Sequence, residues 1–529
     1  MKATMPLLRI SDMSLTIGAT KILQDINLQL QHGEILAITG ESGSGKSMAA
    51  LSIMGLLPRG ALTTGQIMLD GTEILTTSET NLCKLRGDTM SMVFQEPMTA
   101  LNPVQNIGNQ VAETILIHEH TSKKKAHKRA TDMLRRVGLD VAPTRFPHEL
   151  SGGQRQRVVI AMAIVKHPKL LIADEPTTAL DVTTQANILI LLKDLVREFD
   201  MGLLIITHDL AVVADLADHI VVMQKGRVVE SASTPKLLAN MLHPYTRALF
   251  DASRHQVDLP VYKGGLQLVY ASQIVRNYPS PRKTIFGPRP KFCALDNISF
   301  TIDHGERVGL VGESGCGKST LTRVLLGLED VQGGTITLDG EPVFTGKKPN
   351  LTVRRKMQVV FQDPYSSFNP RHRVSRLISE PWNLLDHQPD DPDTRIATAL
   401  ENVGLSALDA FRYIHEFSGG QRQRIAIARA LIVEPDLIIF DEAVSALDVS
   451  VRAQIIDLIV NLSQKRPLAY LFISHDLTVV RNVTDRVLVM KSGRIVEHGP
   501  TEDVFNTPKH PYTRTLLAAA PTLPNSQEA

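Results

Sequence analysis

Short, uninterrupted runs of apolar residues recur along the chain and alternate with longer stretches that have a helical period. These runs end in Gly or an acidic residue, as in GEILAITG, KLLIADE, ERVGLVG and DLIIFDE. A strand that is buried on both faces gives an unbroken apolar run, whereas a half-exposed strand alternates apolar and polar residues. The pattern therefore predicts an α/β protein built on parallel sheets, with helices between the strands.

The whole pattern occurs twice. The segments VFQEP, SGGQRQR, LIADE, ITHDL and HPYTR return as VFQDP, SGGQRQR, IIFDE, ISHDL and HPYTR, each 267 residues later. The segments GESGSGKS and GESGCGKS lie 272 residues apart, which indicates one small insertion between this loop and the glutamine. The chain is a tandem duplication. We expect a first domain over residues 1–250, a linker over 251–265 and a second domain over 266–529.

Composition narrows the class of protein. A length of 529 residues exceeds what one core supports, and 43% hydrophobic with 21% charged residues is ordinary for a soluble globular protein. A net charge of +2 gives no argument for a nucleic-acid partner. The three cysteines have no metal-site or disulfide spacing, which fits a reducing cytoplasm, and we find no apolar run of about 18 residues and no signal peptide. We therefore expect a chain that neither spans a membrane nor is exported by that route.

Each half contains G-x-x-x-x-G-K-S directly after an apolar run. The N–H groups of such a phosphate loop (P-loop) surround the β- and γ-phosphates of a nucleotide, and the following helix directs its positive end at them. Lys46 and Lys318 would reach these phosphates, and Ser47 and Ser319 would hold Mg²⁺. The expected nucleotide-binding residues are Gly40, Ser42, Gly43, Gly45, Lys46 and Ser47, and in the second half Gly312, Ser314, Gly315, Gly317, Lys318, Ser319 and Thr320.

Acidic pairs follow a second apolar run in each half. The aspartates would organise Mg²⁺ and its water shell, and the adjacent glutamates would polarise the attacking water as general bases. A repeated glutamine is placed to contact metal or water, and a repeated histidine to contact the γ-phosphate. The expected catalytic residues are Glu175, Glu442, His208, His475, Gln95 and Gln362. The expected metal ligands are Ser47, Gln95, Asp174, Ser319, Gln362 and Asp441.

The SGGQ segments begin long helices, whose N-terminal N–H groups form a second anion site in each half. Their residues are Ser151, Gly152, Gly153 and Gln154, and Ser418, Gly419, Gly420 and Gln421. One nucleotide cannot easily use both anion sites of one half. If the two halves face each other head to tail, the SGGQ segment of each half could contact the nucleotide bound at the P-loop of the other. This predicts two ATP molecules at a shared interface.

These motifs, in this order and with the ALD turns at Ala179–Asp181 and Ala446–Asp448, resemble the ATP-binding cassette (ABC) superfamily over nearly all of both halves. The resemblance implies two P-loop NTPase domains, each a RecA-like core with a helical subdomain, that hydrolyse ATP. FQEPMTALNP, FQDPYSSFNP and HPYTR resemble the oligopeptide, dipeptide and nickel importer branch, whose fused members drive uptake of peptides, including microcin C. This implies two transmembrane permease subunits and an extracytoplasmic solute-binding protein as partners. It also implies no nucleic acid and a peripheral position on the cytoplasmic face of the bacterial inner membrane.

Two alternatives remain open. The second half has Ala443 where the first has Pro176, a form that resembles nickel-type members and leaves nickel or metal-chelate uptake possible as the cargo class. A soluble twin-cassette ATPase acting on ribosomes or DNA would find support in Lys123–Lys125. In the second half Asp390 and Asp391 stand at the positions of Lys123 and Lys124, which favours a solvated helix face over a phosphate-backbone contact.

Three finer expectations follow from the resemblance. An aromatic residue normally stacks on adenine upstream of the P-loop. Tyr278 is the candidate in the second half, with Phe286 and Phe292 as alternatives, while Ile17 stands at this place in the first half. Segments Glu96–Pro103 and Asp363–Pro370 would receive short permease helices, with Leu101 and Phe368 as apolar contacts. Cys316 matches Ser44, which favours a tolerated loop residue over an acidic thiol at the helix N-terminus.

Overall fold

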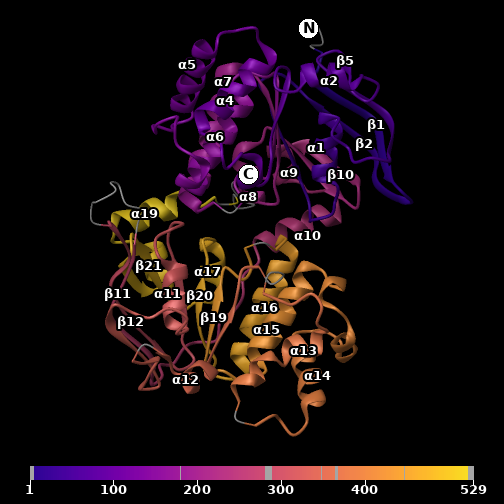
Figure 1. The fold of residues 1–529 in the computed structure, drawn as a ribbon. Coiled ribbons are helices and arrows are strands. Elements are labelled where there is room, and N and C mark those ends of the chain that lie inside the picture. Colours follow the sequence, from indigo (N-terminus) through magenta and orange to yellow (C-terminus); the bar gives the residue numbers. More distant parts are fainter. Residues whose placement is uncertain are drawn as a thin grey trace. The chain divides into compact units, whose positions relative to one another are not determined.

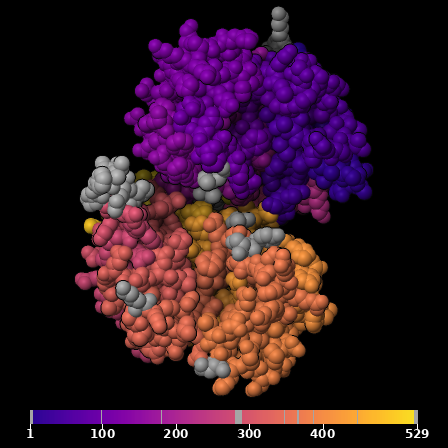
Figure 2. All heavy atoms as spheres, viewed as in Figure 1, coloured from indigo at the N-terminus to yellow at the C-terminus, as the bar shows by residue number. Residues whose placement is uncertain are grey.

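The structure is a computed structural model that describes residues 5–178, 180–279, 289–346, 348–363, 367–385, 387–445, 447–521 and 523. The backbone forms two compact units. The first holds nearly all of the residues up to Arg254, and the second holds those from His255 to Ala520. Figures 1 and 2 draw the first unit from indigo to magenta and the second from pink to yellow.

The first unit contains two sheets. One is four-stranded and antiparallel in the order β2-β1-β4-β5, and the other is six-stranded in the order β10-β9-β3-β8-β7-β6. In the larger sheet the strands from β9 to β6 are parallel, and β10 closes the edge in antiparallel orientation. The strands are β1 Leu8–Ile17, β2 Thr20–Leu30, β3 Ile35–Thr39, β4 Ala61–Leu69, β5 Thr72–Glu73, β6 Met90–Val93, β7 Leu170–Asp174, β8 Gly202–Ile206, β9 His219–Gln224 and β10 Arg227–Ser233.

Helices of the first unit fall into two groups. Helices α4, α5 and α6 contact one another and form a helical subdomain (Figure 1), whereas α1 lies against the strands of both sheets. The helices are α1 Lys46–Met54, α2 Glu79–Leu85, α3 Pro97–Ala100, α4 Ile107–His118, α5 Lys123–Arg136, η1 Pro147–Glu149, α6 Gly152–Ile164, α7 Val182–Phe199, α8 Leu210–Leu216, α9 Thr234–Ala239 and α10 Pro244–Ser253.

The second unit repeats this architecture. Its antiparallel sheet has the order β12-β11-β14-β15, and its larger sheet has the order β18-β19-β20-β13-β21-β22, with β22 antiparallel at the edge. A small additional hairpin pairs β16 with β17. The strands are β11 Gln267–Pro279, β12 Lys291–Asp303, β13 Arg307–Val311, β14 Gly333–Leu338, β15 Glu341–Pro342, β16 Phe344–Thr345, β17 Lys348–Pro349, β18 Met357–Val360, β19 Leu437–Asp441, β20 Ala469–Ile473, β21 Arg486–Lys491 and β22 Arg494–Pro500.

The helical subdomain of the second unit is made of shorter pieces than that of the first. Helices α13 and α14 each contact α15 there, and α16 packs beside α15. The helices are α11 Lys318–Leu325, α12 Leu351–Arg355, α13 Val374–Ile378, η2 Glu380–Leu384, α14 Pro392–Asn402, η3 Ala407–Phe411, η4 Ile414–Glu416, α15 Gly419–Leu431, α16 Val449–Lys465, α17 Leu477–Val483, α18 Thr501–Asn506 and α19 Pro511–Ala518.

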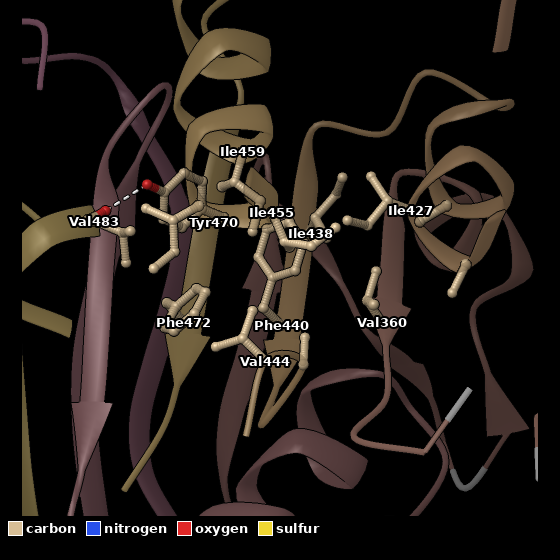
Figure 3. Packing of buried hydrophobic residues seen from close by; sticks show 14 of the residues in the cluster. Val360, Ile427, Ile438, Phe440, Val444, Ile455, Ile459, Tyr470, Phe472 and Val483 are labelled. Atoms are coloured by element: carbon tan, nitrogen blue, oxygen red, sulfur yellow. Dashed lines mark hydrogen bonds between the residues drawn. The ribbon is translucent and has the colours of Figure 1, made fainter. Parts of the chain in front are cut away.

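The central strands are buried along their whole length, which explains the unbroken apolar runs of the sequence. All residues of β3, β7, β8, β13 and β20 are buried, so the predicted α/β fold with parallel buried strands is confirmed. Figure 3 shows the core of the second unit, where the rings of Phe440 and Tyr470 meet edge to face with centroids 5.7 Å apart. The Tyr470 hydroxyl donates a hydrogen bond to the carbonyl of Val483, and burial raises the pKa of this hydroxyl.

Part of the predicted linker lies on the second unit. Helix α10 continues to Ser253, and from His255 onward the chain is bonded to residues of the second unit. The Asn482 side chain donates to the His255 carbonyl at 2.8 Å, and the His255 ring lies 2.7 Å from the Asp457 carboxylate. Arg307 donates to the carbonyl of Pro260. These bonds hold the connecting segment against the second unit.

A search of the helices in the described ranges finds none that is long and apolar enough to cross a membrane.

Candidate active sites

Both P-loops join a buried strand to a helix. In the first unit the loop leads from β3 into α1, and Gly45 before the helix has a φ of 101°. A Cβ on Gly40 would lie 2.2 Å from the Met223 carbonyl oxygen. In the second unit Gly317 has a φ of 114°, and a Cβ on Gly312 would lie 2.2 Å from the carbonyl oxygen of Met490. Only Gly fits these positions, because the backbone approaches a neighbouring strand and then turns into a left-handed conformation.

The P-loop lysines fold back over their own loops. The ammonium of Lys46 donates to the carbonyl oxygens of Gly40 at 2.8 Å and Glu41 at 2.9 Å. Lys318 makes the same two contacts in the second unit, at 2.7 Å and 3.0 Å. Each lysine is 7% exposed. The positive charge is therefore held at the mouth of the loop, where the phosphates of a nucleotide would replace these carbonyl contacts.

The aspartates end the strands β7 and β19 beside the P-loops. Asp174 is 6% exposed, and burial raises its pKa, while the nearby Ser47 hydroxyl and the charge of Lys46 oppose this rise. Its Oδ1 atom is buried without a hydrogen-bond partner. In the second unit, burial and the neighbouring charge of Glu442 raise the pKa of Asp441 to about 6. A buried carboxylate oxygen that lacks a partner, next to a hydroxyl, is an oxygen donor set suited to Mg²⁺.

The catalytic glutamate candidates share an uncommon backbone conformation. Glu175 has a φ of 47° and Glu442 a φ of 51°, in the left-handed region that non-glycine residues rarely adopt. Their N–H groups donate to carbonyl oxygens at the ends of β8 and β20, at 2.8 Å and 2.9 Å. Backbone strain of this kind persists where the surroundings fix it, and it is common at functional sites.

In the first unit the structure brings three of the predicted catalytic residues together. Gln95 donates to the Glu175 carboxylate at 2.7 Å, and the His208 ring nitrogen lies 3.1 Å from the same carboxylate. Thr178, which the sequence did not single out, also donates to it at 2.9 Å. Burial alone would raise the pKa of Glu175, but the hydrogen bond and charge of His208 outweigh burial and lower it. Glu175 is therefore held ionised, as a general base requires.

The second unit has a looser arrangement. His475 lies 3.6 Å from the Glu442 carboxylate, and Gln362 is exposed. Among the side chains that the structure describes, no hydrogen bond joins Gln362 to Glu442. Ser445, at the position of Thr178, donates to the main-chain carbonyl of Glu442 and not to its carboxylate. Here too burial alone would raise the pKa of the glutamate, but the nearby His475 and its charge outweigh burial and lower it.

The SGGQ segments form capping boxes. The Ser151 hydroxyl accepts from the N–H of Gln154 at 3.3 Å, and the Gln154 side chain accepts from the N–H of Ser151 at 3.0 Å. Ser418 and Gln421 repeat this at 3.4 Å and 3.0 Å. The role of these helix starts toward phosphate stays a prediction.

The second glycine of each SGGQ segment has a packing role. A Cβ on Gly153 would lie 2.3 Å from the Thr184 methyl group, and one on Gly420 would lie 2.3 Å from a methyl group of Val451. A Cβ on Gly419, in contrast, would meet nothing within 4 Å. Close helix packing therefore requires Gly at the second position, and the sequence alone did not reveal this.

The adenine-stacking candidates occupy matching places in the two antiparallel sheets. Ile17 ends β1 opposite Thr20, and Tyr278 lies near the end of β11 opposite Phe292. The Tyr278 hydroxyl donates to Glu329, and the guanidinium of Arg276 lies 5.1 Å from the ring centroid. Phe286, Ala179 and Ala446 lie outside the described residues.

The expectation that Leu101 and Phe368 are surface contacts for a partner is wrong. Leu101 is 3% exposed and Phe368 is 4% exposed, with the Arg429 guanidinium 4.6 Å from the Phe368 ring centroid. Both side chains are buried in the helical subdomains. Val104, directly after this segment in the first unit, is an exposed apolar residue at 83% exposed, and the matching Arg371 is also exposed.

The HPYTR tyrosines are also part of the P-loop surroundings. The N–H of Glu41 donates to the Tyr245 hydroxyl at 3.1 Å, and the N–H of Glu313 donates to the Tyr512 hydroxyl at 3.0 Å. The repeat of HPYTR was the only sequence signal for this contact, and it gave no partner.

Comparison with known proteins decides the family. A family model described as ABC transporter matches residues 23–178 and 295–445. The chain belongs to the ABC transporter family. A second model, described as the C-terminal region of oligopeptide/dipeptide transporters, matches residues 229–257 and 496–529. The predicted tandem ABC cassettes and the ATPase activity are confirmed.

The relatives of this ABC ATPase include importer subunits. It is 44% identical to the peptidoglycan transport ATP-binding protein YejF of Agrobacterium fabrum, over 98% of this chain and 97% of that protein. It is 44% identical to the glutathione import ATP-binding protein GsiA of Escherichia coli, over 96% of this chain and 87% of that protein. An archaeal ribosome recycling factor, aABCE1, solved with the ribosomal stalk protein aP1, shares 22% identity over 93% of this chain and 90% of its own, with a TM-score of 0.61. This last likeness shows the fold alone.

Proposed function

We propose that this chain is the ATP-hydrolysing subunit that energises uptake of peptides or related small solutes. The observation that carries the proposal is the presence of two complete cassettes joined to the oligopeptide/dipeptide-type C-terminal region. The names of the relatives support a peptide-like cargo over nickel, since one imports glutathione and the other transports peptidoglycan. Nickel or metal-chelate uptake is the alternative that the experiment below separates from it.

In this proposal each P-loop binds the phosphates of one ATP. The carboxylate of Glu175 or Glu442 takes a proton from the attacking water, and His208 or His475 holds that carboxylate and contacts the γ-phosphate. Mg²⁺ supplies charge neutralisation on the phosphates when it is bound. The residues that would hold it are Ser47, Gln95 and Asp174, and Ser319, Gln362 and Asp441. The orphaned Oδ1 of Asp174 supports this donor set.

We also propose that the SGGQ helix of one cassette completes the P-loop site of the other. The capping box fixes the start of the helix, and the first N–H groups of a helix have no partner within it, which suits them to a γ-phosphate. Binding of two ATP molecules would then close the two cassettes, and hydrolysis would release them. This cycle would drive two permease subunits on the cytoplasmic face of the bacterial inner membrane, with an extracytoplasmic solute-binding protein delivering the cargo.

Val104, which we propose as a permease contact in place of the buried Leu101, gives a test of permease coupling. Val104→Asp is expected to lower transport several-fold while basal ATPase activity is kept, because Val104 is exposed beside the glutamine segment. Ile117→Asp, at a residue 70% exposed on α4, is the matched control and is expected to leave both activities unchanged. Equal loss of transport in both variants would contradict a specific contact at Val104.

The proposed function itself is tested by reconstitution. The chain is purified with the permeases and the binding protein encoded beside it and placed in vesicles that contain ATP. We expect ATP-dependent uptake of labelled di- and tripeptides or glutathione, and no uptake with the Lys46→Ala, Lys318→Ala double variant. Uptake of a nickel chelate without peptide uptake would support the alternative cargo. ATP hydrolysis stimulated by ribosomes, with no uptake of any solute, would overturn the importer assignment.

A further inference from the structure

The HPYTR segments have no role in the catalytic scheme above, yet both are built into the fold in the same way. Each one begins a helix that follows the last edge strand of its cassette: α10 in the first and α19 in the second. The glutamates Glu230 on β10 and Glu497 on β22 hold the start of these helices. Glu230 accepts hydrogen bonds from the N–H groups of Leu242 and His243 at 2.8 Å and 3.1 Å.

The second copy repeats this anchoring, because Glu497 accepts from the N–H groups of Lys509 and His510 at 2.7 Å and 3.1 Å. The histidines then cap the helices. The Nδ1 atom of His243 accepts from the N–H of Tyr245 at 3.2 Å, and His510 accepts from Tyr512 at 3.1 Å. Pro at the first helical position needs no N–H partner. The His and Pro of the motif therefore fix the place from which the tyrosine side chain leaves the helix.

Both tyrosines end at the same atom of the P-loop. The N–H of the second P-loop residue, Glu41 or Glu313, donates to the tyrosine hydroxyl at 3.1 Å and 3.0 Å. The carbonyl of that same residue accepts from the P-loop lysine at 2.9 Å and 3.0 Å. Tyr512 is 5% exposed and Tyr245 is half-buried. The peptide groups before and after this residue are thus each held by at least one hydrogen bond.

We propose that Tyr245 and Tyr512 are positioning residues of the two ATP sites, so that the C-terminal region of each cassette is a structural part of its P-loop. The loop begins with Gly40 or Gly312 at a φ of 146° or 153°, a conformation that L residues rarely adopt. The tyrosine hydroxyl holds the residue directly after this glycine. A loop fixed in its binding conformation binds phosphate more tightly, because less conformational entropy is lost on binding.

The test isolates one site at a time. Tyr245→Phe, in a Glu442→Gln background that silences the second site, removes only the hydroxyl that accepts from Glu41. We expect the KM for ATP to rise about threefold to tenfold while kcat changes less than about twofold, the size expected for one lost hydrogen bond. Tyr512→Phe in a Glu175→Gln background should give the same result at the second site. Tyr270→Phe, at a residue 43% exposed on β11, is the matched control and should change neither parameter.

A second measurement separates positioning from general stability. Without nucleotide, the Tyr→Phe variants should unfold at the wild-type temperature, whereas the rise in unfolding temperature caused by ATP should shrink. If Tyr245→Phe does not fold, Glu230→Gln is measured instead; it leaves the hydroxyl in place but weakens the anchor of α10, and it should raise the KM to a lesser degree. An unchanged KM in both cassettes, or a fall in kcat alone, would overturn the inference.

The inference rests on the proposed ATP hydrolysis at the two P-loops. A control distinguishes a failure of the ATPase sites from a failure of the inference about the tyrosines. The Glu442→Gln parent must hydrolyse ATP, and adding Lys46→Ala must abolish that activity. Failure of these controls would count against the ATPase sites themselves. If the controls behave as expected and the Tyr→Phe variants keep the wild-type KM for ATP, only the proposed role of the tyrosines is contradicted.

Discussion

The two cassettes share the lysine and tyrosine contacts of their P-loops but differ around the proposed catalytic glutamate and at the proposed adenine position. Gln95, Thr178 and His208 all contact Glu175 in the first cassette. In the second, His475 approaches Glu442 at 3.6 Å, and no glutamine contact to Glu442 occurs among the described side chains. At the adenine position the first cassette has the aliphatic Ile17, whereas the second has Tyr278, tied to Glu329.

This comparison shows which residues of the two sites have the same arrangement in both cassettes and which residues differ. The aspartates end the central strands β7 and β19, the glutamates follow directly, and the lysines begin the helices α1 and α11; the lysine contacts to the Gly40 and Gly312 carbonyls have nearly the same length in both copies, 2.8 Å and 2.7 Å. The glutamine segment lies in a loop, and Ile17 and Tyr278 lie at or near the ends of the strands β1 and β11, where fewer neighbours constrain the side chains than in the middle of a sheet. Two sites with equal catalytic groups can therefore differ in nucleotide affinity.

The largest effect is expected from the glutamates. Glu175→Gln combined with Lys318→Ala, and Glu442→Gln combined with Lys46→Ala, each leave one P-loop with a neutral residue in place of the base. Turnover should fall by roughly 10²-fold or more relative to the matching single Lys→Ala variant, with ATP binding retained. Turnover is measured by phosphate release, and Glu113→Gln, at an exposed glutamate, is the control. Normal turnover in either variant would contradict the base assignment at that site.

A pH-dependent effect on stability is expected at Asp441. Burial raises its pKa to about 6 from an ordinary value of 3.8, so the folded state disfavours the charged form. The resulting loss of stability grows as the pH rises from about 4 to 6 and is complete above that range. Asp441→Asn should therefore raise the free energy of unfolding of the nucleotide-free protein by about 1–3 kcal/mol at pH 8, and by less at pH 5.

The measurement for Asp441 is urea-induced unfolding in EDTA at the two pH values. Asp503→Asn, at an exposed residue, is the control and should have no effect at either pH. Asp174→Asn should act in the same direction as Asp441→Asn, because burial also raises the pKa of Asp174. A destabilised Asp441→Asn protein at pH 8 would show that the carboxylate is stabilised by a contact that outweighs its burial.

A smaller effect is expected at the adenine position. Stacking of a base on an aromatic ring contributes about 1–3 kcal/mol, so the first site should bind ATP up to roughly tenfold more weakly than the second and discriminate less between ATP and GTP. Titration of Lys318→Ala reports the first site and titration of Lys46→Ala reports the second. Ile17→Tyr should tighten the first site. Equal ATP affinities at the two sites, with no tighter binding in Ile17→Tyr, would contradict this predicted difference between the cassettes.

The smallest effect is expected inside the P-loops, where Ser44 of the first cassette and Cys316 of the second occupy equivalent positions. Both are buried, at 3% and 6% exposed, and both lie within 4.0 Å of their lysine ammonium. Burial raises the pKa of the Cys316 thiol, which keeps it protonated and unreactive. Cys316→Ser and Ser44→Cys should change the KM for ATP by less than about twofold. In maleimide labelling the exposed Cys83 should react well before Cys316, and the reverse order would indicate an acidic thiol.

The sequence by itself determined the duplication, the buried parallel strands and the positions of the P-loops, carboxylates and SGGQ helices. These features are local: an unbroken apolar run, a glycine where the backbone must turn, or a serine that caps a helix acts over a few residues. The sequence also singled out Tyr278 as the aromatic candidate upstream of the second P-loop and Ile17 as the aliphatic residue that stands at this place in the first half. The family assignment followed from the order of these motifs.

Only the tertiary structure decided which distant residues meet. It buried Leu101 and Phe368, which the sequence had suggested as surface contacts, because packing of the helical subdomains was not visible in a single segment. It joined the Tyr245 hydroxyl to Glu41 across 204 residues and the Tyr512 hydroxyl to Glu313 across 199. Such contacts depend on the order of strands in the sheet, since β9 and β21 lie beside the P-loop strands β3 and β13, and the edge strands β10 and β22 paired with them precede the helices α10 and α19 that carry the tyrosines. A pattern along the chain specifies each strand, but the hydrogen bonds between strands specify its neighbours.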